Sequence, residues 1–121
     1  MAEMDVPSWI QQAVHGFGEA MQLQHFALNA QGVAGVRLET GARLRLELRG
    51  EELCMLLLTP AGDSVREFLD LLTAAHPRRQ RGPWPMHVAY RDGQAIRLVK
   101  LPSSAISRPQ LEAAFRELWS R

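Results

Sequence analysis

The stretch VRLETGARLRLELRGEELCMLLLT, residues 36–59, decides the fold class of this chain. In its first part apolar and charged residues alternate, which is the period of a β-strand with one face in a core and one face in water. Glycine-containing turns at residues 40–41 and 50–51 divide the stretch into three consecutive strands, and such short turns predict an antiparallel meander. The third strand, residues 52–59, is apolar on both faces, so its second face needs a cover.

A helix is predicted before this meander. Asp5 and Ser8 offer N-caps, and apolar residues then recur with helical spacing. These apolar residues are Ile10, Ala13, Val14, Phe17 and Met21. Gly16 and Gly18 weaken such a helix by about 1 kcal/mol each relative to alanine, so we expect packing or a small-residue contact to stabilise it there. Over residues 23–35 the periodic pattern loosens.

A second helix, a hairpin and a third helix are predicted after the meander. A capping box that begins at Ser64 starts the second helix. The helix ends at residue 76, because Pro77 follows. The hairpin, residues 86–101, turns at Asp92-Gly93, which is a strong turn signal. Ser107 caps the third helix together with Gln110 in the capping-box position. The apolar stripe of that helix is Leu111, Ala114, Phe115, Leu118 and Trp119, and we expect Trp119 to lie in the core.

The predicted order of elements is therefore α-β-β-β-α-β-β-α, an α+β fold with an antiparallel sheet. Length and composition fit one globular domain over residues 1–121, since 46% of the residues are hydrophobic and 22% are charged. These values exclude a disordered, collagen-like or coiled-coil chain. The net charge of +1 gives no reason to expect that the whole chain binds a polyanion.

The compartment is predicted from cysteine usage and from the apolar runs. Cys54 is the single cysteine, so it forms no internal disulfide, and its apolar neighbours predict a buried, inert thiol. The longest apolar run, residues 53–58, is far shorter than the roughly 20 residues that span a bilayer, and the start of the chain has no secretory signal. We therefore expect a soluble protein of the reducing cytoplasm that does not insert stably into membranes.

No pattern for catalysis or metal binding is present. The four histidines include no pair at the i, i+4 spacing that places two imidazoles on one helix face. Gly16-Phe17-Gly18 lacks the third glycine and the preceding strand of a dinucleotide-binding loop. Neither a G-x-S-x-G elbow nor a G-x-x-x-x-G-K loop occurs. We therefore expect no enzyme activity, no metal and no cofactor.

Residues 76–84 carry the alternative functional signal. Their arginines, Arg78, Arg79 and Arg81, can hold phosphates, and the ring of Trp84 can stack on a base. A small nucleic-acid-binding domain is therefore the alternative function, although no second aromatic residue lies nearby on a strand, and a solvated rim explains the same charges. Trp84 lies between two prolines and is also a candidate for burial against a neighbouring chain.

The predicted sheet is incomplete by itself. Five strands and only three helices leave faces and edges of the sheet uncovered. Apolar surface around residues 53–58 and in the hairpin of residues 86–101 must therefore meet another polypeptide.

The chain resembles the class I chaperones of bacterial type III secretion. The resemblance rests on the order of elements, on Ser8-Trp9-Ile10 in the first helix, on the Leu-rich meander that ends in Leu56-Leu57-Leu58-Thr59-Pro60, and on the closing helix of residues 111–118. Within the family, the terminal segments look most similar to the SycN-type subunit, which pairs with a second small chaperone on the secretion gatekeeper protein.

This resemblance implies a noncatalytic homodimer or heterodimer that holds the N-terminal region of a secreted effector or gatekeeper protein in an export-competent state. It implies a place in the bacterial cytoplasm, near the secretion apparatus. The cargo candidates that it gives are Ile10, Val14, Phe17, Val36, Leu38, Leu44, Leu46 and Leu48. Each of these is placed equally well to belong to the core of the chain itself. The dimer candidates are Val65, Phe68, Leu69, Leu72, Trp84, Val88, Ile96 and Leu98. An extended cargo segment would add to a sheet edge, without any nucleotide.

Overall fold

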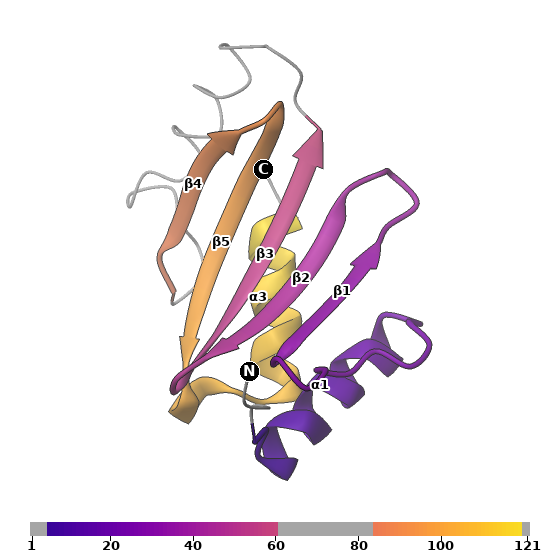
Figure 1. Cartoon of the computed structure of the whole chain (residues 1–121), viewed down its shortest axis with the longest axis vertical. Helices are drawn as coiled ribbons and strands as arrows, with labels where there is room; N and C mark the ends of the chain where they lie inside the picture. Colours follow the sequence, from indigo (N-terminus) through magenta and orange to yellow (C-terminus); the bar gives the residue numbers. More distant parts are fainter. Residues whose placement is uncertain (1–4, 61–83, 120–121) are drawn as a thin grey trace.

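A computed structural model describes residues 5–60 and 84–119 of the chain. The predicted second helix and most of the basic segment, residues 61–83, lie outside the described residues. The described elements follow the predicted order (Figure 1). They are α1 (Ser8–Ala20), β1 (Val33–Arg37), β2 (Arg43–Arg49), β3 (Glu52–Pro60), β4 (Met86–Arg91), β5 (Gln94–Pro102), the short 3-10 helix η2 (Ser103–Ala105) and α3 (Arg108–Trp119).

The five strands form one antiparallel sheet in the order β1-β2-β3-β5-β4. The meander β1-β2-β3 is therefore extended by β5, and β4 lies at the outer edge (Figure 1). The turn between β4 and β5 holds Asp92 and Gly93 at φ 53° and 76°, as a tight turn of mirror-image type requires. Both the antiparallel sheet and this hairpin are confirmed.

The register separates two faces of the sheet. One row of cross-strand partners runs through all five strands as Ala34, Leu46, Met55, Val99 and Met86, and all of them are buried. Because partners in register point to the same side, this row marks the face on which α3 contacts β3 and β5. We call it the helix face; α3 lies behind the sheet in Figure 1. Its further buried residues are Leu44, Leu48, Leu53, Leu57 and Leu101.

Helix α1 closes the core with Ile10, Val14 and Phe17. The predicted caps are wrong, because Pro7 is the N-cap and Ser8 already lies in the first turn. The carbonyl of Pro7 accepts hydrogen bonds from the N–H groups of Ile10 and Gln11, and no side chain of the described residues caps the helix.

The glycines of α1 have the predicted role of close contact. A Cβ atom on Gly18 would lie 2.7 Å from the Cβ of Phe26, so only glycine lets Phe26 pack there against the helix. The segment that follows α1 is accordingly held in place. The Gln11 amide donates to the carbonyl of Leu28 and accepts from its N–H at 2.9 and 2.8 Å, and the side chains of both Phe26 and Leu28 are buried. Side-chain contacts fix this segment where no periodic pattern was visible.

Helix α3 begins as predicted, but its last residue does not lie where the sequence predicts. The N–H of Gln110 donates to Ser107 Oγ at 3.3 Å, which confirms the cap, and Leu111 and Leu118 are fully buried. Trp119, however, is 44% exposed, so the prediction that it belongs to the core is wrong. It is the last residue of the helix and stacks on the ring of Phe115 with centroids 5.7 Å apart, instead of reaching the sheet.

Candidate functional site

The second face of the sheet carries an apolar stripe on its two central strands. Leu56 of β3 pairs with Leu98 of β5, and Leu58 pairs with Ile96, so that four large side chains form one cluster. All four are partly exposed, in contrast to Leu57, which lies between two of them in the sequence and is buried. Because the described helices lie against the other face, we call this one the open face. These residues confirm that β3 is apolar on both sides.

Charged residues lie on the open face beside the stripe, on β1 and β2. Glu47 forms ion pairs with two arginines: Arg45 Nε lies 3.0 Å from its Oε2, and Arg49 Nη2 lies 2.7 Å from its Oε1. The hydrogen bond and the charge of Glu47 raise the pKa of Arg49. Arg37 and Arg43 are direct cross-strand partners. Within the described residues no carboxylate forms an ion pair with either of them.

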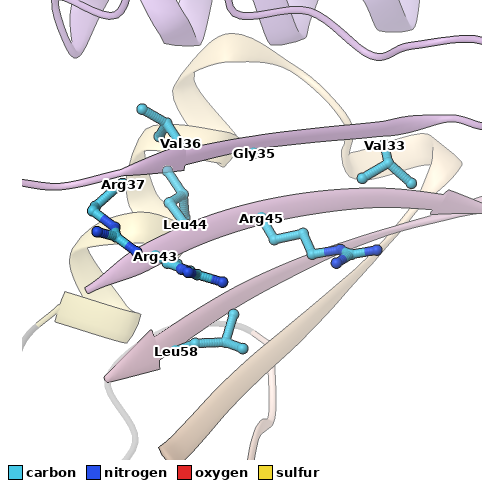
Figure 2. A pocket seen from close by; sticks show the side chains of 8 residues that line it. All are labelled: Val33, Gly35, Val36, Arg37, Arg43, Leu44, Arg45 and Leu58. Carbon is cyan, nitrogen blue, oxygen red and sulfur yellow. The ribbon is translucent and has the colours of Figure 1, made fainter. Parts of the chain in front are cut away.

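A groove is lined by residues of β1 and β2 and by Leu58 of the apolar stripe. Its volume is about 410 Å³, and we call it the arginine groove. The residues of its lining that belong to the open face are Val33, Gly35, Arg37, Arg43, Arg45 and Leu58. Figure 2 shows the three arginine side chains with Leu58 beyond them on β3. The groove thus combines an apolar wall with cationic groups.

The outer edge of β1 borders the groove. The Leu38 N–H donates to the Ala42 carbonyl and the Leu48 N–H to the Gly32 carbonyl, both at 2.8 Å, so even-numbered residues of this segment bond to β2. In an antiparallel pair the main-chain groups alternate in direction, so those of Gly35 and Arg37 point away from β2. Arg37 thus offers main-chain groups at the sheet edge and its side chain in the groove.

Cys54 is buried, as its apolar neighbours predict. The side chain is 6% exposed, and burial raises the pKa of the thiol. Among residues 5–60 and 84–119, no group of three or more His, Cys, Asp or Glu side chains is placed to hold a metal ion. In the same part of the chain, no helix is both long and apolar enough to cross a membrane.

Most of the cargo candidates predicted from the sequence lie in the hydrophobic core of the chain. Six of the eight are buried inside the chain, namely Ile10, Val14, Phe17, Leu44, Leu46 and Leu48. Val36 and Leu38 are partly buried and pack against that core. The structure thus gives the six buried residues the intramolecular role that the same pattern allowed, and direct contact of any of the eight with cargo stays a prediction.

The dimer candidates are divided among three places. Val65, Phe68, Leu69 and Leu72 lie outside the described residues. Ile96 and Leu98 lie on the open face, within the apolar stripe. Trp84 and Val88 are partly buried and pack against the core, so they do not share a surface with the stripe. Trp84 Nε1 is buried, and no acceptor bonds to it within the described chain.

The basic segment cannot be assembled into a site from the described residues. Its arginines, Arg78, Arg79 and Arg81, lie outside them, and Trp84 packs against the core. The sequence reasoning also missed the arginine groove. Alternation placed Arg43 and Arg45 on one face, but the exact partner of Arg37 depends on the register between β1 and β2.

The comparisons with known proteins identify the fold. No protein-family model and no curated protein matches the chain. Five of the solved structures that match do so at 13–17% identity. The ExsC–ExsE complex aligns with a TM-score of 0.71 at 17% identity, covering 95% of this chain and 89% of that one. The HopA1–SchA chaperone–effector complex gives 0.68 at 15% identity, covering 94% and 92%.

A third match is the Yersinia pestis type III secretion chaperone SycH, solved with a stable fragment of YscM2. It aligns with a TM-score of 0.66 at 16% identity, covering 90% of this chain and 92% of that one. At these identities the likeness concerns the fold. The chain therefore has the α+β fold of type III secretion chaperones over nearly its whole length.

Proposed function

We propose that the chain is a noncatalytic type III secretion chaperone. It forms a dimer with an identical or different subunit, binds the N-terminal region of a secreted effector or gatekeeper protein, and keeps that region ready for export. The observation that carries this proposal is the apolar stripe of Leu56, Leu58, Ile96 and Leu98 on the open face of a sheet with the chaperone fold. The proposal places the protein in the bacterial cytoplasm, near the secretion apparatus.

The apolar stripe is the proposed centre of the dimer interface. Four large aliphatic side chains on the two central strands form a contiguous patch, and such patches mark surfaces that meet another polypeptide. The resemblance adds Val65, Phe68, Leu69 and Leu72 of the predicted second helix to this interface. A SycN-type heterodimer on a gatekeeper protein is the specific form that the terminal segments favour.

Cargo binding requires no chemistry beyond hydrogen bonds and burial. An extended segment can add to the edge of a sheet through main-chain hydrogen bonds and place alternate side chains in pockets. The segment remains unfolded while its apolar residues are covered. Neighbouring structures support this role for the fold, since one is described as a chaperone–effector complex and another as a secretion chaperone with a fragment of a second protein.

Co-expression tests the proposal. The tagged chain is produced with the products of neighbouring open reading frames, purified, and washed at low and at high salt. We expect a secreted protein to co-purify through its N-terminal region, and the complex to survive high salt because apolar contacts dominate it. A complex that forms only with nucleic acid and weakens steeply with salt would favour the alternative function. A chain that retains none of the secreted proteins of its source would contradict the proposal.

A further inference from the structure

We propose that the arginine groove binds an acidic, extended polypeptide segment laid along the edge of β1. The inference deepens the proposed function, because it rests on that function for the identity of the bound chain as cargo. What it adds is a chemical preference, namely a carboxylate side chain at the position that faces Arg37 and Arg43.

The first argument is the charge left without a partner. Arg37 and Arg43 are directly opposite each other on neighbouring strands, and like charges in that position destabilise a sheet. Arg45 and Arg49 of the same face share Glu47, whereas the described residues supply no carboxylate to the Arg37 and Arg43 pair. A carboxylate from another molecule would relieve this repulsion and could accept bidentate hydrogen bonds from a guanidinium.

The second argument is the space at Gly35. Among the described residues a Cβ atom at this position would meet only the carbonyl oxygen of Leu44, at 3.8 Å, so no packing within this part of the chain demands glycine here. Gly35 has no left-handed backbone that would require glycine either. A glycine inside a strand often marks a place where a ligand approaches the backbone closely, and Gly35 lies in the lining of the groove.

The third argument is the edge. Val33 is already engaged, since its N–H donates to Asn29 Oδ1 at 3.1 Å and its carbonyl accepts from the Asn29 N–H at 2.9 Å. The open part of the edge is therefore at Gly35 and Arg37, immediately beside the groove. A strand added there would direct every second side chain to the open face. A carboxylate beside Arg37 and an apolar side chain two residues away, over Gly35, would match the lining.

The same features favour a polypeptide over a nucleic acid. Among the described residues no aromatic ring lines the groove, so they offer a base no ring to stack on. Arg45 is already paired with Glu47, so the described part of the groove offers two unpaired guanidinium groups rather than a track of phosphate contacts. The apolar side chain of Val33 suits a peptide side chain instead.

The test uses short labelled peptides and the full chain. One peptide is an alternating valine and threonine sequence in which two positions carry glutamate. Its matched control has glutamine at those two positions. Fluorescence anisotropy is expected to give about tenfold tighter binding of the acidic peptide, as for a charge-assisted hydrogen bond. The double variant Arg37→Gln, Arg43→Gln should lose this preference and bind both peptides alike. Arg49→Gln, which removes a charge of the same face outside the groove, should keep it.

A steric variant checks the location. Gly35→Val fills the groove at an exposed strand position, and its binding of both peptides should fall by about tenfold or more while its melting temperature stays within a few degrees of wild type. Gly35→Ala should give a smaller decrease. These readouts do not require the natural cargo.

Several outcomes would overturn the inference. Equal binding of both peptides by the wild type, no measurable binding of either, or a preference that survives in the double variant would each do so. Tighter binding of a single-stranded oligothymidine than of the acidic peptide would assign the groove to nucleic acid instead. Cargo that co-purifies equally with the wild type and the double variant would reject the groove as its binding site and leave the proposed function standing. Selective binding of the acidic peptide by a chain that retains no secreted protein would instead support the groove and reject the proposed function.

Discussion

The two faces of the same sheet differ in what they do with their apolar residues. On the helix face, Leu46, Met55 and Val99 form a row that is at most 1% exposed beneath α1 and α3. On the open face, Leu56 and Leu98 are equally large and equally central, yet both stay partly exposed. Residues adjacent in sequence thus serve two purposes, since one set builds the fold and the other is available to a partner.

Charge distinguishes the faces as well. The open face carries the arginines and glutamate of β2, together with Arg37. On the helix face, Arg97 is held within the chain, because its Nη1 donates to the carbonyl of Leu118 at 2.6 Å, near the end of α3. A cation at a helix C-terminus is stabilising, so this charge belongs to the fold.

The largest expected effect is on the helix face. Leu46→Ala should lower the free energy of unfolding by about 2–5 kcal/mol, because it leaves a cavity in a fully buried row. Arg45 precedes Leu46 in the sequence and points to the opposite face. Arg45→Ala should change the free energy of unfolding by about 0.5 kcal/mol or less. Denaturant unfolding of both variants measures the difference, and similar losses would mean that the faces are not distinct.

A smaller effect is expected where α1 closes the helix face. Gly18→Ala should lower the free energy of unfolding by about 1–3 kcal/mol, because the new Cβ would lie 2.7 Å from Phe26 Cβ. Gly16→Ala is the matched control. Its Cβ would lie 3.3 Å from Arg108 Cδ, in a side chain that can move, so the gain in helix propensity should make it neutral or stabilising. Melting curves that rank the two variants in the opposite order would contradict the packing described for α1.

The hydrogen bonds that hold the segment after α1 should contribute still less to the free energy of unfolding. Gln11→Ala removes both hydrogen bonds to the main chain of Leu28, and we expect a loss of about 1–2 kcal/mol, with faster amide exchange at Leu28. Gln12→Ala removes an exposed neighbour and should have no measurable effect. An unchanged exchange rate at Leu28 would show that other contacts hold this segment.

The smallest effect concerns Cys54 on the open face. Burial raises the pKa of its thiol, so the folded chain holds this proton more tightly than the unfolded chain does. Stability is therefore unaffected below the ordinary thiol pKa of about 8.5, and it decreases as the pH rises above that value, where the unfolded state ionises first. The slope of unfolding free energy against pH between about 8 and 10 should be less negative in Cys54→Ala than in wild type. Equal slopes would contradict the burial of this thiol.

Local patterns predicted most of the fold. Alternation around Leu44 and Leu46 identified β2 and its buried side, and Asp92-Gly93 identified the hairpin. The start of β1 was placed too late, because Ala34 and Gly35 are weak strand formers that only the pairing with β2 holds in a ladder. The insertion of β5 beside β3 depends on contacts between distant segments, which no local pattern reports.

The candidate site was less predictable for the same reason. Hydrophobicity assigned Phe17 and Leu46 to a possible cargo surface and to the core equally well, and only the packing of helices on the sheet separates these roles. The pairing of Arg37 with Arg43, and the groove next to it, follow from register and from a missing side chain at Gly35.

The mass of the protein in solution tests most directly whether the open face is covered by a second polypeptide. Light scattering should give the mass of two subunits for the wild type, alone or with its second chaperone subunit, rather than 13.6 kDa. Leu98→Glu should give 13.6 kDa with an unchanged circular dichroism spectrum. A wild-type chain that stays a stable 13.6 kDa monomer, alone and in the presence of every candidate subunit, would contradict the account.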